Sequence, residues 1–75
     1  MRLSEFRRAV LDEFGASYGR VVTGDLVIAD LGNRTADAAL ADGVPAGDVW
    51  MALCEATQVP RARRYGVGLP DPRRR

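Results

Sequence analysis

The side chains that most often do chemistry in proteins are scarce in this chain of 75 residues. It has no His, which is the commonest general base near neutral pH, and a single cysteine, Cys54. Asp25 and Asp30 lie five residues apart and would diverge on a helix, so they form no obvious acid–base pair. The sequence also lacks a Cys/His cluster for a metal and a glycine-rich phosphate loop after a strand. We therefore expect no catalytic residue, no metal, no cofactor and no enzymatic activity.

Arginine is the second chemical feature, because all eleven basic residues are Arg. Residues 1–60 carry five Arg against nine acidic residues, a net charge of −4, whereas residues 61–75 carry six Arg against one Asp, a net +5. A basic segment can neutralise phosphates in a salt-dependent contact, and an aromatic side chain can stack on an unpaired base. The candidate nucleic-acid contacts are Arg61, Arg63, Arg64, Tyr65, Arg73, Arg74 and Arg75. The favoured interpretation is a solvated, flexible tail, since this segment is also rich in Pro and Gly.

Two helices are expected between residues 35 and 57. Thr35 can cap a helix over 36–42, and Gly43 can end it. Pro45 suits the first turn of a second helix that runs to about Thr57. The apolar face of this second helix contains Val49, Trp50, Leu53, Cys54 and Ala56. Cys54 on that face is expected to be an inert core thiol.

The same pair of helices matches a degenerate helix-turn-helix pattern over 35–57. The small residue, the glycine and the two aliphatic residues that the motif requires fall at Ala39, Gly43, Val44 and Val49. The outward positions of the second helix are Asp48, Met51, Glu55 and Gln58. These include two carboxylates and no Arg, which opposes binding in a DNA groove.

The N-terminal part predicts a helix that Ser4 caps, with Phe6, Val10 and Phe14 in the core and Leu3 and Leu11 widening the apolar face. Gly15 should interrupt it. Residues 16–31 fit a helix that is broken near Gly24 with Thr23 as a local cap, although the β-branched pairs around Gly24 also fit a hairpin.

Trp50 has two interpretations. The simpler one is core, beside Cys54 one helical turn away. The alternative is a partly exposed anchor for a partner protein, because Trp and Met are enriched at the centres of interfaces. In that case the partner-binding residues would be Trp50, Met51 and Glu55.

An ordered series of short motifs runs through residues 1–60, and these motifs are Met1-Arg2-Leu3, Glu5-Phe6, Leu31-Gly32, Arg34-Thr35, Ala39-Leu40, Gly43, Val49-Trp50, Ala52-Leu53-Cys54 and Val59-Pro60. With this series the chain resembles a small bacterial family catalogued as domain of unknown function 3046. The resemblance implies a short, all-helical protein without an assigned activity. The chain departs from the family pattern at Leu26, where the family often has His, so no role of that His carries over.

We therefore expect an all-α fold, a compact bundle of three to four short helices over residues 1–60, followed by a disordered, flexible Arg-rich tail over residues 61–75. The longest apolar run has six residues, far short of the ~18 of a membrane span. A cytoplasmic protein is expected, because a lone Cys suits a reducing compartment. We expect a small non-catalytic interaction or regulatory module, a monomer or weak homodimer, that binds a protein partner through its helical surface. The alternative is a nucleic-acid-associated protein that uses the Arg-rich tail and the degenerate helix-turn-helix.

Overall fold

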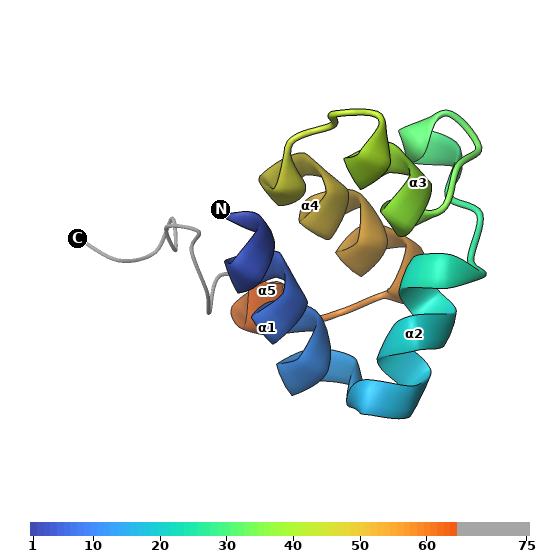
Figure 1. The fold of residues 1–75 in the computed structure, drawn as a ribbon. Helices are drawn as coiled ribbons and strands as arrows, with labels where there is room; N and C mark the ends of the chain where they lie inside the picture. Colours follow the sequence, from blue (N-terminus) through green and yellow to red (C-terminus); the bar gives the residue numbers. More distant parts are fainter. Residues whose placement is uncertain (65–75) are drawn as a thin grey trace.

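The computed structural model describes residues 1–64 of the chain, and these form a compact helical bundle (Figure 1). Tyr65, Arg73, Arg74 and Arg75 lie outside the described residues. The elements in chain order are α1 (Leu3–Phe14), α2 (Ala16–Gly24), the 3-10 helix η1 (Ala29–Leu31), α3 (Ala36–Ala41), α4 (Ala46–Thr57) and α5 (Arg61–Arg64). The expectation of an all-α bundle is confirmed.

Helix α1 begins two residues earlier than a cap at Ser4 would give. Arg2 is its N-cap, and the Arg2 backbone N–H donates to Glu5 Oε1 at 2.6 Å, so Glu5 and not Ser4 stabilises the first turn. Phe6, Ala9 and Val10 form the buried face of α1. Leu3 and Leu11 do not widen that face, since each is about half exposed.

Gly15 separates α1 from α2 with a φ of +80°, a backbone conformation that glycine adopts without strain. The turn folds α2 back against α1 as a V (Figure 1). The close contact between them depends on Gly19, because a Cβ there would lie 3.0 Å from Val10 Cγ1. Thr23 is buried near the end of α2 and donates its hydroxyl to Gly19 O at 2.9 Å, so it does not cap a new helix as expected.

The expected break near Gly24 is present, but the chain does not continue as an α-helix up to residue 31. Ile28 pairs with Arg34 in an isolated antiparallel bridge, and η1 fills the short loop between them. Gly32 closes η1 in the left-handed conformation, with a φ of +72°. Of the β-branched residues around Gly24, Val21, Val22 and Thr23 lie in α2, so the alternative hairpin does not form, and only Val27 and Ile28 lie in the segment that is not α-helical.

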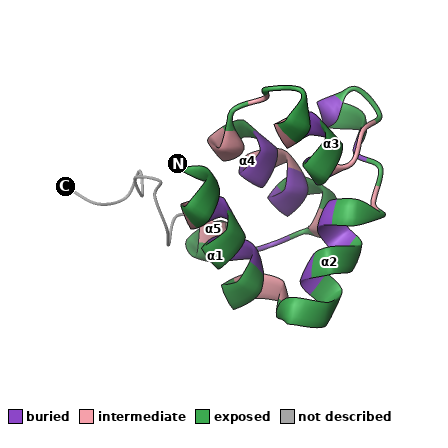
Figure 2. Ribbon diagram, viewed as in Figure 1, coloured by how far each residue is buried: buried purple, intermediate pink, exposed green. Residues whose placement is uncertain are grey.

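Helices α3 and α4 follow their predicted bounds closely. Thr35 caps α3 by accepting a hydrogen bond from Ala38 N at 3.1 Å, Gly43 has a φ of +91°, and Pro45 immediately precedes α4. The centre of the core is formed by the largest fully buried side chains, which are Trp50, Phe6, Leu53, Val49 and Cys54. Figure 2 shows these buried segments of α1 and α4 facing one another inside the bundle.

Helix α5 comprises the first four residues of the segment expected to be a flexible tail. It lies beside α1, although the two are far apart in the sequence (Figure 1). Arg63 Nε pairs with Glu13 Oε1 at 3.0 Å, and Arg64 O accepts a hydrogen bond from Trp50 Nε1 at 2.7 Å. The ordered unit therefore extends to residue 64, because basic side chains of this segment find partners on an acidic body. The prediction for residues 65–75 lies outside the described residues.

Candidate functional site

A shallow groove lies between α1 and α2 on the outer surface of the bundle, with a volume of about 270 Å³. Val10, Gly19 and Thr23 lie along its inner side and are buried. Leu11 on α1 and Ala16 on α2 line it and are exposed. On the side of α2 the lining residues include Ala16 and Gly19, which have little or no side chain.

The charge of the groove differs from that of the body around it. Its lining includes Arg7 and Arg20 and no acidic residue, although residues 1–60 carry a net charge of −4. Arg7 Nη1 pairs with Asp37 Oδ1 at 3.0 Å, and the Arg7 side chain is still 52 % exposed. Arg20 is exposed and forms no ion pair within residues 1–64. The groove is therefore apolar along its length and cationic at its rim.

Trp50, the first of the predicted partner-binding residues, belongs to the core. It is 2 % exposed, packs edge-on against Phe6 and Phe14, and donates its indole N–H to Arg64 O. The interpretation as a partly exposed anchor does not fit this structure. The other two residues lie nearer the surface, because Met51 is half-buried and Glu55 is exposed and pairs with Arg64 Nη1 at 2.8 Å. Their role in partner binding stays a prediction.

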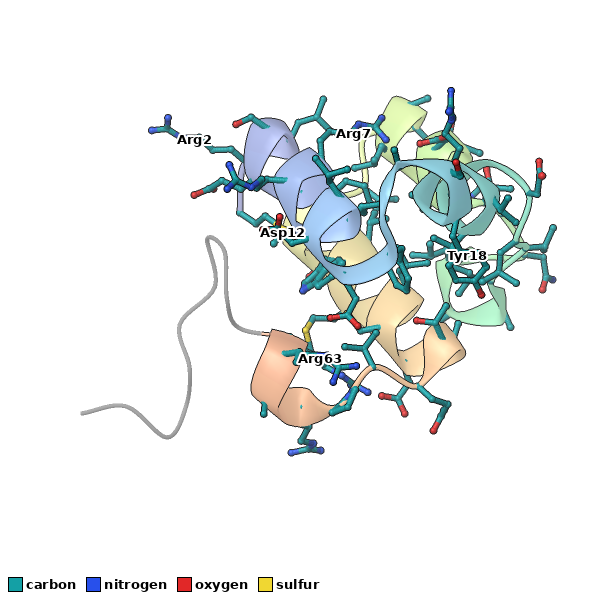
Figure 3. The ribbon with its side chains drawn as sticks, turned by 90° about the horizontal axis from the view of Figure 1, so that it is seen from below. Arg2, Arg7, Asp12, Tyr18 and Arg63 are labelled. Atoms are coloured by element: carbon teal, nitrogen blue, oxygen red, sulfur yellow. The ribbon has the colours of Figure 1, made fainter. Side chains whose placement is uncertain are left out.

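The three described arginines among the predicted nucleic-acid contacts differ in their surroundings. Arg64 has a side chain that is only 11 % exposed, and its Nε donates to Val59 O at 2.7 Å. The hydrogen bond from Arg63 to Glu13 raises the pKa of the Arg63 guanidinium further above its ordinary value. Arg61 is exposed. Figure 3 shows Arg63 and Arg7 on opposite sides of the molecule, so α5 and the groove are separate basic regions.

Cys54 is fully buried, as expected for a core thiol. Burial raises the pKa of Cys54 from 9.0 to about 12, against a smaller opposing effect of Arg64. The thiolate is the nucleophilic form of cysteine, so the thiol is unreactive at neutral pH.

The predicted helix-turn-helix residues occupy the expected positions in the α3–α4 pair. Ala39 and Val49 are buried at the contact between the two helices, while Asp48 and Glu55 face solvent on α4. The packing of such a pair is therefore present, and its outer surface is acidic. Within residues 1–64, no group of three His, Cys, Asp or Glu side chains could hold a metal ion. In the same range, no helix has the length and apolar character needed to cross a membrane.

Sequence reasoning did not single out the groove residues. The spacing of Leu11 predicts that it widens the apolar face of the first helix, and Ala16 and Arg20 lie in the segment that also fits a hairpin. Gly19 carried the available signal, because a glycine inside a helical pattern often marks a close approach of two backbones.

Comparison with known proteins supports the resemblance noted in the sequence. No curated protein and no solved structure matches the chain. A family model described as "Protein of unknown function (DUF3046)" matches residues 1–62. This match covers most of the chain, including nearly all of the helical bundle described above, and the chain belongs to the DUF3046 family.

Proposed function

We propose that this chain is a small non-catalytic module that binds a protein partner through the outer surface of α1 and α2. The observation that carries the proposal is the apolar character of that surface. On α1, the large apolar side chains Leu3 and Leu11 remain about half exposed, with exposed fractions of 52 % and 51 %, and Leu11 lines the groove. Exposed apolar surface that adjoins a groove is typical of interaction sites.

The distribution of polar groups supports a binding role over a catalytic one. Within residues 1–64, every buried side-chain nitrogen or oxygen has a hydrogen-bond partner in the fold. The one thiol is buried and protonated, and the ion pairs Arg7–Asp37, Arg8–Asp12 and Arg34–Asp42 lie at the surface of the bundle. These groups stabilise the bundle through contacts within the fold, so the groove is the surface that we propose for binding. The proposal places the protein in the cytoplasm, where a lone cysteine stays reduced.

Affinity capture tests this proposal. The full chain is the bait, and the extract comes from the cells that express it. The extract is divided, and one half is treated with nuclease before capture. The proposal predicts that a protein co-purifies in near-stoichiometric amount from both halves. A variant with Leu11→Ser is the matched bait, since it removes an exposed apolar side chain of the groove without touching the core. Recovery only from the untreated half, or equal recovery with both baits, would reject the proposal.

The second candidate function is nucleic-acid binding, which the packing of α3 against α4 and the exposed Arg61 favour. The acidic residues Asp48 and Glu55 on α4 oppose it, as does the pairing of Arg63 and Arg64 with carboxylates of the body. A gel-shift assay at low and at physiological salt compares the full chain with a chain ending at Arg64. Equal mobility of single-stranded and duplex oligonucleotides with the two proteins would reject a role of Tyr65, Arg73, Arg74 and Arg75.

A further inference from the structure

We propose that the α1–α2 groove binds an amphipathic helix of the partner protein, with apolar side chains in the groove and acidic side chains paired with Arg20 and Arg7. This inference rests on the proposed function, because it assigns the surface and the chemistry of the partner. It requires that the groove accept apolar side chains, that its charge select acidic ones, and that its shape suit a helix.

The apolar contact is provided by the walls of the groove. Leu11 is 51 % exposed and lies across from Ala16, so a Leu or Ile side chain of the partner would cover both. At the closest approach of α1 and α2, Gly19 lets the Val10 side chain lie against the backbone of α2, so the inner side of the groove is apolar. Burial of one such apolar side chain would exclude water from Leu11 and so favour binding.

Charge selects the polar side of the partner. The groove lining carries two guanidinium groups and no carboxylate, in a body whose first sixty residues are acidic overall. Arg7 is partly neutralised by Asp37, whereas Arg20 forms no ion pair within the described residues. A carboxylate of the partner would therefore pair first with Arg20, while the acidic remainder of the surface would repel it elsewhere.

The shape of the site favours a helical segment over an extended one. An extended peptide binds most often by adding a strand to a free sheet edge, and residues 1–64 contain one isolated bridge and no strand. A groove between two packed helices instead accepts the apolar face of a third helix, with anchors spaced three or four residues apart. The expected partner segment has apolar residues at helical spacing flanked by Asp or Glu.

Selection from a random peptide library displayed on phage, with the full chain immobilised, tests the inference. Enriched peptides are synthesised with a fluorescent label and titrated with the protein by fluorescence anisotropy. We expect enriched sequences with Asp or Glu beside apolar residues at helical spacing. The dissociation constant should rise about tenfold or more for Arg20→Glu and for Leu11→Ser. A peptide with its Glu changed to Lys should bind the Arg20→Glu protein better than it binds the unmodified one.

Two variants control for charge and for lost apolar surface. Arg61→Glu makes the same charge change at an exposed residue that does not line the groove, and Val27→Ser removes a side chain that is 59 % exposed outside it. Both should change the dissociation constant less than twofold, and circular dichroism should show unaltered helix content in all four variants.

The inference would be overturned if basic peptides were enriched or if no peptide were enriched. It would also be overturned if the enriched peptides bound all variants with the same dissociation constant. Self-association of the chain that Leu11→Ser abolishes would overturn it too, because the groove would then hold a second copy. These failures are separable from failure of the proposed function. If capture yields a nuclease-resistant protein partner with the Arg20→Glu bait but not with the Leu11→Ser bait, the acidic helix is the wrong ligand and the binding role of the α1–α2 surface stands.

Discussion

Ending the chain at Pro60 should destabilise the helical bundle, whereas ending it at Arg64 should retain the described contacts. The two proteins differ by α5 alone, whose four residues supply the acceptor for Trp50 Nε1–H and the arginines that pair with Glu13 and Glu55. The comparison therefore isolates the contribution of a segment that is rich in arginine and has no buried residue.

The loss is dominated by the Trp50 hydrogen bond. A buried donor that loses its partner costs about 1–3 kcal/mol, and the value falls toward the lower end if water reaches the freed N–H. The pair between Arg64 and Glu55 adds about 0.5 kcal/mol, since Glu55 is well exposed. We expect a total near 2 kcal/mol, a large fraction of the stability of a domain of this size.

Urea unfolding followed by fluorescence measures this difference directly, because Trp50 is the only Trp of the chain. With a dependence on urea of about 1 kcal/mol/M, the midpoint of the protein ending at Pro60 should be lower by roughly 2 M. Its native emission should also shift to longer wavelength. Coincident midpoints and emission maxima for the two proteins would refute the account of α5 as part of the folded unit.

Three further predictions concern the core, the helix contact and the ion pair within α1. Cys54 should react with a disulfide reagent only as fast as the chain unfolds. Because the pKa of its thiol is higher in the folded state, the free energy of unfolding should fall by about 1.4 kcal/mol per pH unit from pH 9 toward 12. Cys54→Ala should lack this component, and an equal dependence of the free energy of unfolding on pH in both proteins would contradict the prediction. Gly19→Leu should lower the free energy of unfolding by about 2 kcal/mol through overpacking against Val10, whereas Gly24→Ala should raise it by about 0.5 kcal/mol. Both are measured by thermal unfolding. A Gly19→Leu protein that is more stable than the Gly24→Ala protein would show that α1 and α2 do not pack closely. Arg8→Ala should cost less than about 0.5 kcal/mol in thermal unfolding because its i,i+4 pair with Asp12 is exposed, and a loss of several times that amount would contradict a solvent-screened pair.

The parts of the fold that could be predicted from sequence are those with strong local signals. Thr35, Gly43 and Pro45 define the ends of α3 and α4, since capping and backbone chemistry act within a few residues. Phe6 and Val10 were assigned to the core correctly because their spacing matches one face of a helix.

The features that escaped prediction depend on contacts between distant residues. Leu3 and Leu11 share the helical spacing of the core residues, yet α2 packs against Val10 and leaves both leucines half exposed. Helix α5 is held by Glu13, fifty residues away from Arg63, and by the indole of Trp50. Its sequence alone shows only a cluster of charge beside proline, which is typical of a tail. The groove was missed for the same reason, because it forms only when Gly19 brings α2 against α1.

Site-specific photocrosslinking in the cells that express the protein tests most directly whether α1 and α2 form a protein-binding surface. A photoreactive amino acid replaces Leu11 in the groove and, in a matched protein, Ala41 at the exposed end of α3. We predict an adduct of one defined protein mass from position 11, resistant to nuclease, and none from position 41. Adducts that nuclease removes, or equal labelling from both positions, would contradict the account.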